Sequence, residues 1–177
     1  QAASSHTGSL AGDNAIAEAL MEKTGAIVVR SLEEAFLLGA ALSKMPRFSG
    51  KRVGVVSNAG GPGTLIADAL SEAGFELPLM SRELRDELAA FVMPQASTSN
   101  PLDLVATALP EHYSKAVELM LECGIYDALI LMVVPPVGVD TGAVAAAVAE
   151  PLRKAGIPVV SCFFGPSAGE RGRRVML

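Results

Sequence analysis

The sequence predicts an α/β protein built on a parallel β-sheet with helices on both faces. A uniformly apolar stretch at 128–134 is typical of a strand that is covered on both faces, and residues 157–165 are interpreted as another buried strand. Helical patterns alternate with the strands, and short loops containing Gly and Pro connect them. Such an alternation requires right-handed crossovers between parallel strands. For residues 50–177 it favours a flavodoxin-like sheet over a longer Rossmann sheet.

The first 45 residues form too little sheet to fold alone. A helical pattern from Asp13 ends at Gly25, and the apolar stretch 26–30 resembles a short strand. Ser31 and Glu34 have the spacing of a capping box, which predicts a helix from 32 to about 43. We therefore expect residues 1–45 to be a loop-helix-strand-helix remnant, the C-terminal end of a preceding domain, and residues 46–51 to be a linker.

Residues 52–177 show the regular alternation of strands and helices expected of a second domain, which we expect to be truncated at its C-terminus. Its predicted elements are strand 52–58, helix 61–74, strand 75–80, helix 82–91, a helix from 110, strand 128–134, helix 138–156 and strand 157–165. Pro78 predicts that strand 75–80 lies at an edge, because proline cannot donate to a ladder. Leu65, Ile66 and Leu70 belong to one apolar stripe of the first helix.

Composition excludes several classes of function. The net charge is −5 and aromatic residues make up 5% with no Trp, which disfavours nucleic acid as a partner. No stretch reaches the roughly 18 apolar residues of a membrane span. Cys123 and Cys162 match no metal spacing and are interpreted as reduced thiols, so we expect a cytoplasmic protein. The basic cluster 171–174 is interpreted as a solvated helix face.

The loop 57–64 is the most informative stretch for binding. A buried strand leads into Asn58, and Gly60, Gly61, Gly63 and Thr64 open a helix. Free amides at a helix start form an anion site, and glycines let a ligand approach the backbone. The loop therefore predicts phosphate binding, although it is neither a Gly-Lys-Ser/Thr phosphate loop nor a GxGxxG fingerprint. A tight turn without a ligand is the alternative.

Three further residues are candidates for a supporting role. Asn100 and Asp103 lie in "NPLD", which is first of all a turn sequence, and Asp140 stands where a helix cap is expected. His112 lies beside Tyr113 on a surface helix and is given no functional role.

His6 is the other histidine, and small residues flank it in "SSHTGSLAG". A histidine that accepts a phosphoryl group needs an accessible neutral ring nitrogen and a carboxylate that orients the ring. No such carboxylate is recognisable nearby. From the residues alone, an ordinary loop histidine stays the alternative.

Three separated stretches resemble the NDP-forming acyl-CoA synthetases, the ADP-forming acetyl-CoA synthetases related to succinyl-CoA synthetase. They are "SSHTGSLAGDNAIAEALMEKTGAIVVRSLEEAF", "KRVGVVSNAGGPGTLIADALSEAGFEL" and "NPLDL". The resemblance implies two flavodoxin-like ligase domains of the succinyl-CoA ligase type. It also implies His6 as the phosphorylated residue, and the glycines with Thr64 as groups that stabilise the phosphohistidine.

The resemblance further implies partners that this sequence does not contain. These are a CoA-binding domain and an ATP-grasp domain, a small-molecule acid or acyl-CoA, Mg²⁺, ATP or ADP, and CoA, in an oligomeric enzyme. We expect the chain alone to hold no cofactor and to be inactive. The alternative is a non-catalytic, ligand-binding domain of the kind fused to protein acetyltransferases. A flavodoxin-type electron carrier is disfavoured because Tyr113 and Tyr126 are poorly placed to sandwich a flavin.

Overall fold

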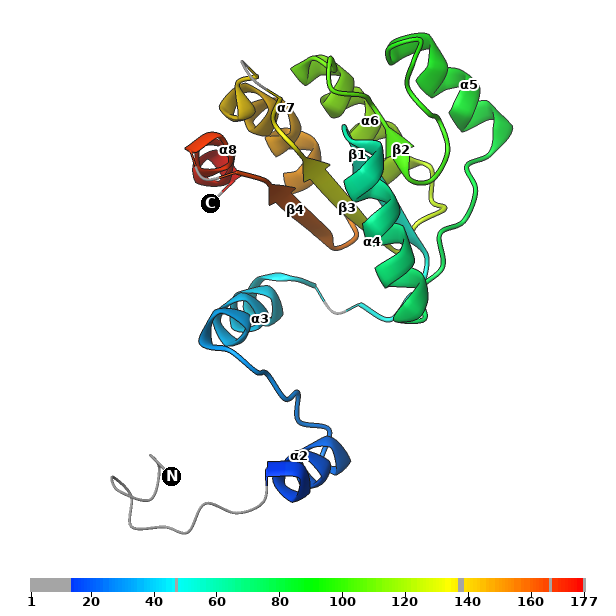
Figure 1. The fold of residues 1–177 in the computed structure, drawn as a ribbon. Helices are drawn as coiled ribbons and strands as arrows, with labels where there is room; N and C mark the ends of the chain where they lie inside the picture. Colours follow the sequence, from blue (N-terminus) through cyan, green and yellow to red (C-terminus); the bar gives the residue numbers. More distant parts are fainter. Residues whose placement is uncertain (1–13, 47, 137–138, 166, 177) are drawn as a thin grey trace. The chain divides into compact units, whose positions relative to one another are not determined.

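The computed structural model describes residues 14–46, 48–136, 139–165 and 167–176. Figure 1 shows the fold, and the chain divides into two compact units, Gln1–Lys44 and Met45–Leu177. Each unit is described by itself.

The first unit contains two helices, α2 (Asn14–Lys23) and α3 (Leu32–Lys44). The predicted end of α2 at Gly25 and the predicted start of α3 at Ser31 are both confirmed. Gly25 has φ +75° just after α2, and the Ser31 hydroxyl accepts a hydrogen bond of 3.1 Å from the Glu34 amide. These are the glycine stop and the capping residue that the sequence indicates.

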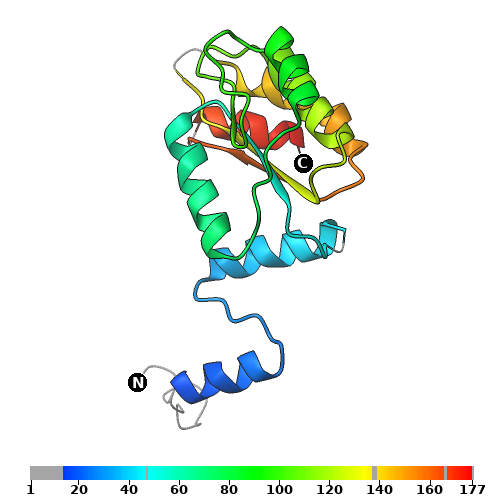
Figure 2. The same cartoon turned by 90° about the vertical axis from the view of Figure 1, so that its right-hand side faces the viewer.

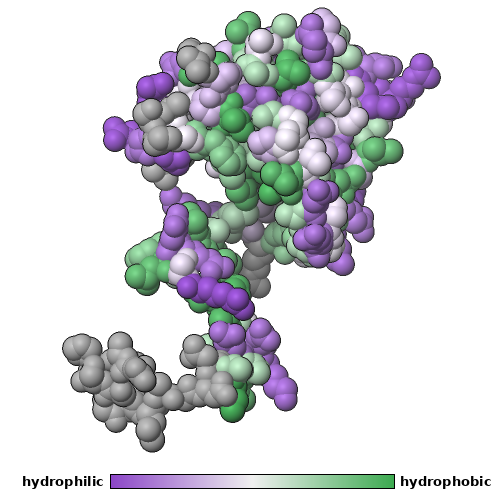
Figure 3. All heavy atoms as spheres, viewed as in Figure 1, coloured by the Kyte–Doolittle hydropathy of each residue, from purple (hydrophilic) through white to green (hydrophobic). Residues whose placement is uncertain are grey.

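The strand predicted at 26–30 is wrong, because these residues have no strand conformation. A strand needs a neighbouring strand to pair with, and the described part of this unit contains none. α3 also exposes four large apolar side chains, those of Leu32, Phe36, Leu37 and Leu42. Figure 3 shows the hydrophobic surface of the molecule in green.

The second unit is built on four parallel strands: β1 (Val53–Ser57), β2 (Leu102–Asp103), β3 (Ala128–Val133) and β4 (Val159–Phe163). Their spatial order is β2-β1-β3-β4 (Figure 1), so the predicted flavodoxin-like sheet is confirmed. The chain leaves β1 toward β2 on one side and returns to place β3 on the other. The crevice between the carboxyl ends of β1 and β3 is therefore the topological switch point, where such sheets bind ligands.

Five helices accompany this sheet: α4 (Gly60–Glu72), α5 (Arg82–Phe91), α6 (Pro110–Glu122), α7 (Thr141–Arg153) and α8 (Ser167–Met176). Figure 2 shows α4 on one face of the sheet and α5, α6 and α7 on the other. The alternation along β1 produces this division. Val55 packs toward Ile66 and Leu70 of α4, whereas Val56 belongs to the larger core with α6 and α7. Leu65, predicted on the same stripe of α4, is 71% exposed.

The predicted edge strand at 75–80 is also wrong. Only one bridge, between Arg52 and Glu76, joins this segment to the sheet. The edge strand beside β1 is instead β2, which lies within the stretch that the sequence predicts as a turn. Pro78 has no N–H to donate to a neighbouring strand. In addition, the Asn100 side chain bonds the Val55 amide and the Val53 carbonyl of β1, which a longer edge strand would otherwise use.

Arg52 and Asp127 fasten the start of β1 to the start of β3. The Asp127 carboxylate accepts from the Arg52 guanidinium at 2.5 and 3.0 Å and from the amides of Lys51 and Arg52 at 3.1 and 3.0 Å. The hydrogen bonds from the Arg52 side chain, followed by those from the backbone amides, hold the pKa of Asp127 well below its usual range.

This low pKa predicts an acid-dependent loss of stability. A depressed carboxyl pKa stabilises the fold above the unfolded pKa of about 3.9, and the contribution is lost as the pH falls further through the folded pKa. Urea unfolding of Asp127→Asn between pH 6 and pH 2.5 should therefore depend less on pH than that of the wild type. Equal pH dependence of the two proteins would show that this carboxylate is not the linked group.

No helix within the described residues is long and apolar enough to cross a bilayer.

Candidate functional site

Buried polar side chains gather at the carboxyl edge of the sheet. Within the described ranges the buried polar residues are Ser57, Asn58 and Thr141, at 0%, 2% and 0% exposure. Ser57 ends β1 and Asn58 follows it, and Thr141 begins α7 just after the loop that leaves β3. Burying polar groups is unfavourable unless they are hydrogen-bonded, so their concentration here marks an edge that is built for more than packing.

The start of α4 presents two amides without an acceptor. Ala59 is the N-cap, and its amide and carbonyl are both hydrogen-bonded to the Ser57 hydroxyl, at 3.1 and 3.0 Å. Pro62 has no N–H, and the Gly63 amide donates to the Ala59 carbonyl at 3.1 Å. The amides of Gly60 and Gly61 donate to no acceptor within the described residues. Two adjacent free amides at the positive end of a helix suit one oxyanion.

The three glycines of this turn differ in the room that a side chain would have there. A Cβ on Gly60 would lie 3.1 Å from the Asp103 carboxylate, and a Cβ on Gly63 would meet Ser57 and Pro101 at ordinary distances of 3.6 and 3.7 Å. A Cβ on Gly61 would meet no atom within 4 Å. Gly61 has no positive φ either, so nothing in the described fold requires glycine there.

Thr64 and Asn58 contribute to the turn through internal hydrogen bonds. The Thr64 hydroxyl donates to the Gly60 carbonyl one turn back, at 3.0 Å. The Asn58 carboxamide donates to the Val134 carbonyl at 2.7 Å and accepts from the Val134 amide at 2.8 Å. Both polar atoms of Asn58 are therefore committed to the β3–α7 loop.

Asn100 supports the sheet. Its carboxamide accepts from the Val55 amide at 3.0 Å and donates to the carbonyls of Val53 and Pro78 at 2.9 and 3.1 Å. It thus substitutes for a strand residue along β1 and holds in place the strand that leads into the anion site.

Asp103 ends β2 beside the first turn of α4. One carboxylate oxygen accepts from the Val105 amide at 2.9 Å, and the other faces Gly60. Val105 has φ +61°, a conformation that is unfavourable for a β-branched residue. Burial raises the pKa of the neighbouring Tyr113, and the charge of Asp103 raises it further, so this phenol stays protonated at neutral pH.

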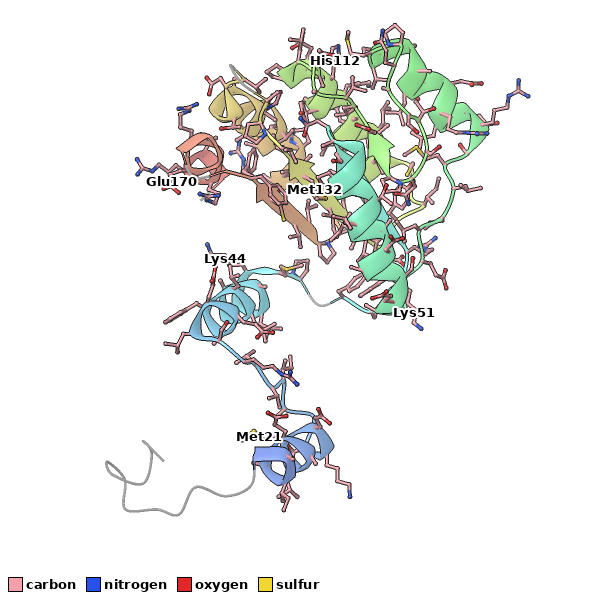
Figure 4. All side chains as sticks on the ribbon, viewed as in Figure 1. Met21, Lys44, Lys51, His112, Met132 and Glu170 are labelled. Atoms are coloured by element: carbon pink, nitrogen blue, oxygen red, sulfur yellow. The ribbon has the colours of Figure 1, made fainter. Side chains whose placement is uncertain are left out.

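Asp140 and His112 have local roles in the structure. The Asp140 carboxylate caps α7 by accepting from the Gly142 amide at 2.9 Å. The His112 ring accepts from the Leu109 amide through Nδ1 at 3.0 Å, and Figure 4 shows the residue on α6. Arg171, Arg173 and Arg174 lie exposed on α8, two of them paired with Glu170, as expected of a solvated helix face.

The structure thus brings Asn58, Gly60, Gly61, Gly63 and Thr64 together with Asp103 at the start of α4. Asp140 lies at the start of α7. His6 lies outside the described residues. Sequence reasoning missed the roles of Ser57 and Val134, which shape the turn. The Ser57 hydroxyl could have been considered from its place in the loop 57–64, whereas Val134 contributes only backbone groups that no side-chain pattern reveals.

Metal ligands do not gather anywhere in the described residues, where no group of three or more His, Cys, Asp or Glu side chains could hold an ion.

Comparison with known proteins places this architecture in a family. Residues 53–174 match the model of the Ligase-CoA domain, and residues 1–42 match the model of the succinyl-CoA ligase-like flavodoxin domain. The alpha subunit of the ADP-forming acetate–CoA ligase II from Pyrococcus furiosus is 38% identical over 136 residues, which are 77% of this chain and 30% of that one. The ADP-forming 4-hydroxybutyrate–CoA ligase of Nitrosopumilus maritimus is 30% identical over 176 residues, 99% of this chain and 25% of that one.

A solved structure of an acetyl-coenzyme A synthetase also resembles this chain. The acetyl-coenzyme A synthetase 1 of Candidatus Korarchaeum cryptofilum, in complex with phosphate and ADP, superposes with a TM-score of 0.84 at 31% identity, over 97% of this chain and 37% of that one. The chain thus spans less than two fifths of each of these proteins. With its parallel sheet, its glycine-rich α4 start and these matches, the chain belongs to the Ligase-CoA domain family that includes the ADP-forming acyl-CoA ligases.

Proposed function

We propose that this chain is part of an acid–thiol ligase that interconverts acyl-CoA, ADP and phosphate with carboxylic acid, CoA and ATP. In the direction of ATP formation, phosphate displaces CoA from the acyl group and an acyl phosphate forms. A histidine nitrogen then takes the phosphoryl group and releases the carboxylic acid, and ADP takes the phosphoryl group from the histidine. The names of these relatives, two ADP-forming CoA ligases and an acetyl-coenzyme A synthetase, support this reaction over the non-catalytic alternative.

Within this scheme His6 is the phosphoryl carrier, and the start of α4 binds a phosphoryl or phosphate oxygen. The observation that carries the proposal is the pair of free amides at Gly60 and Gly61, preceded by a turn whose own polar groups are satisfied. Asp103 and Asp140 are proposed to support the site. Mg²⁺, the nucleotide and CoA are assigned to the CoA-binding and ATP-grasp domains that the resemblance implies.

Phosphoryl labelling tests the function. The complete enzyme, with its CoA-binding and ATP-grasp domains, is incubated with radiolabelled ATP and Mg²⁺. An adduct that is labile in acid and stable in alkali, as a phosphohistidine is, should form on this segment. An enzyme that folds and binds nucleotide but takes up no such label would contradict the proposal.

Gly61→Val tests the phosphate site separately from the fold. A side chain at position 61 meets no protein atom, so the free energy of unfolding should be unchanged or slightly higher. The side chain would, however, hinder approach to the adjacent amides, and we expect the affinity for inorganic phosphate to fall about ten-fold, a difference of about 1.4 kcal/mol. The measurement is a phosphate titration followed through the amide NMR signals of residues 60 and 61.

Gly156→Val is the matched control for this experiment. Gly156 also has open space around its Cβ position and no positive φ, but it lies between α7 and β4. Its variant should bind phosphate like the wild type. If Gly61→Val binds phosphate equally well, the amides at the start of α4 are not the ligands.

A further inference from the structure

The Asn58 side chain joins two loops at the switch point of the sheet. β1 and β3 are hydrogen-bonded neighbours up to the pair Val56 and Leu131, after which their chains diverge toward α4 and α7. Asn58, 2% exposed, spans this divergence by bonding both backbone polar groups of Val134, 76 residues later in the chain. It therefore continues the ladder between the strands by one more pair of hydrogen bonds, made by a side chain.

This bond lies immediately before the free amides. Asn58 is followed by the N-cap Ala59, and then by Gly60 and Gly61. On the other side of Asn58, Ser57 fixes Ala59 through its hydroxyl. Two buried polar side chains in succession thus determine the path of the backbone into α4, and each of their polar atoms already has a hydrogen-bond partner in the backbone.

We propose that Asn58 is a positioning residue for phosphate: its bond to Val134 holds the Gly60 and Gly61 amides in the orientation that a phosphate oxygen needs. The inference rests on the proposed function, because it deepens the role of the same site. Amides that are already ordered lose little conformational freedom when the anion binds, which strengthens binding without any direct contact from Asn58. Asn58, predicted from the sequence as a phosphate ligand, thereby acts through its backbone neighbours.

The test compares Asn58→Ala with a variant of similar instability elsewhere. Val148→Ala removes fully buried methyl groups in the middle of α7, away from α4, and serves as the control. For each protein, urea unfolding gives the stability, hydrogen exchange gives the protection of the Val134 amide, and NMR titration with inorganic phosphate gives the affinity through the signals of residues 60 and 61.

In Asn58→Ala the Val134 amide should lose protection and the phosphate affinity should fall about ten-fold, the size expected from disordering one short segment. Val148→Ala should keep both properties. Asn58→Ser is a second variant in case alanine prevents folding, since its shorter hydroxyl cannot reach both groups of Val134 and leaves room for water. It should show the same loss of affinity.

The outcomes separate the two proposals. If the wild type binds phosphate at residues 60 and 61 and the Asn58 variants bind it as tightly, the positioning role is overturned and the phosphate site stands. The same holds if Val148→Ala loses affinity to the same extent, because the effect would then follow from instability alone. If phosphate leaves the wild-type signals of residues 60 and 61 unchanged, the phosphate site of the proposed function fails, and the positioning role fails with it.

Discussion

Replacing His6 with alanine is expected to abolish the acid-labile phosphoryl label in the complete enzyme. Alanine offers no nitrogen nucleophile, so the phosphoryl group of the acyl phosphate or of ATP has no acceptor on this segment. The expected loss is complete, because a phosphoryl carrier has no partial substitute. The measurement is the label retained after alkali and after acid, together with the overall rate of ATP formation.

The chain provides its own control, since it contains two histidines. The Nδ1 of His112 accepts from the Leu109 amide at the start of α6, so this ring has a structural partner. His112→Ala should keep the label and lose at most some stability. A label that persists in His6→Ala and disappears in His112→Ala would reverse the assignment, and equal labelling of both variants would return His6 to an ordinary loop residue.

Asn100→Ala is expected to have the largest effect on stability. The substitution removes three hydrogen bonds at once and leaves the Val53 carbonyl and the Val55 amide, both in a buried strand, without their partner. A buried polar group that loses its partner costs about 1–3 kcal/mol, so the free energy of unfolding should fall by about 3 kcal/mol or more. Urea unfolding followed by circular dichroism measures the loss.

Gln95→Ala is the matched control, because Gln95 carries the same carboxamide and is exposed between α5 and β2. Its removal should change stability by less than about 0.5 kcal/mol. Asn100→Asp keeps an acceptor for the Val55 amide but turns a carboxylate toward two carbonyl oxygens. It should therefore be no more stable than the alanine variant at pH 7. A loss for Asn100→Ala as small as that of Gln95→Ala would show that Asn100 does not hold β1.

Much of the second unit could be predicted from local patterns. Apolar runs placed β1, β3 and β4, and local signals placed the helix ends at Gly74, Ser81 and Asp140. Each of these features depends on residues close in the chain, such as a glycine with positive φ or an oxygen that accepts from an amide two or three residues on. The glycine-rich turn at 57–64 was recognisable for the same reason.

The edge of the sheet could not be predicted in this way. The apolar stretch 75–80 has strand composition, yet the pairing groups of β1 are taken by β2 and by the Asn100 side chain. Distant segments compete for the hydrogen-bonding groups at the edge of a sheet, and composition does not show which segment will pair there. The strand predicted at 26–30 was wrong for a similar reason, because a segment with strand propensity forms no strand without a neighbouring strand to pair with.

By itself, the sequence determined the fold class, the helix caps and the location of the anion-binding turn, because each depends on periodicity or on contacts a few residues apart. Only the tertiary structure decided what the polar side chains of that turn do. It joined Asn58 to Val134 and Asn100 to β1, and it left the Gly60 and Gly61 amides free. The physical reason is that a buried carboxamide must find partners for both of its polar atoms, and those partners are backbone groups that approach only when the sheet has formed.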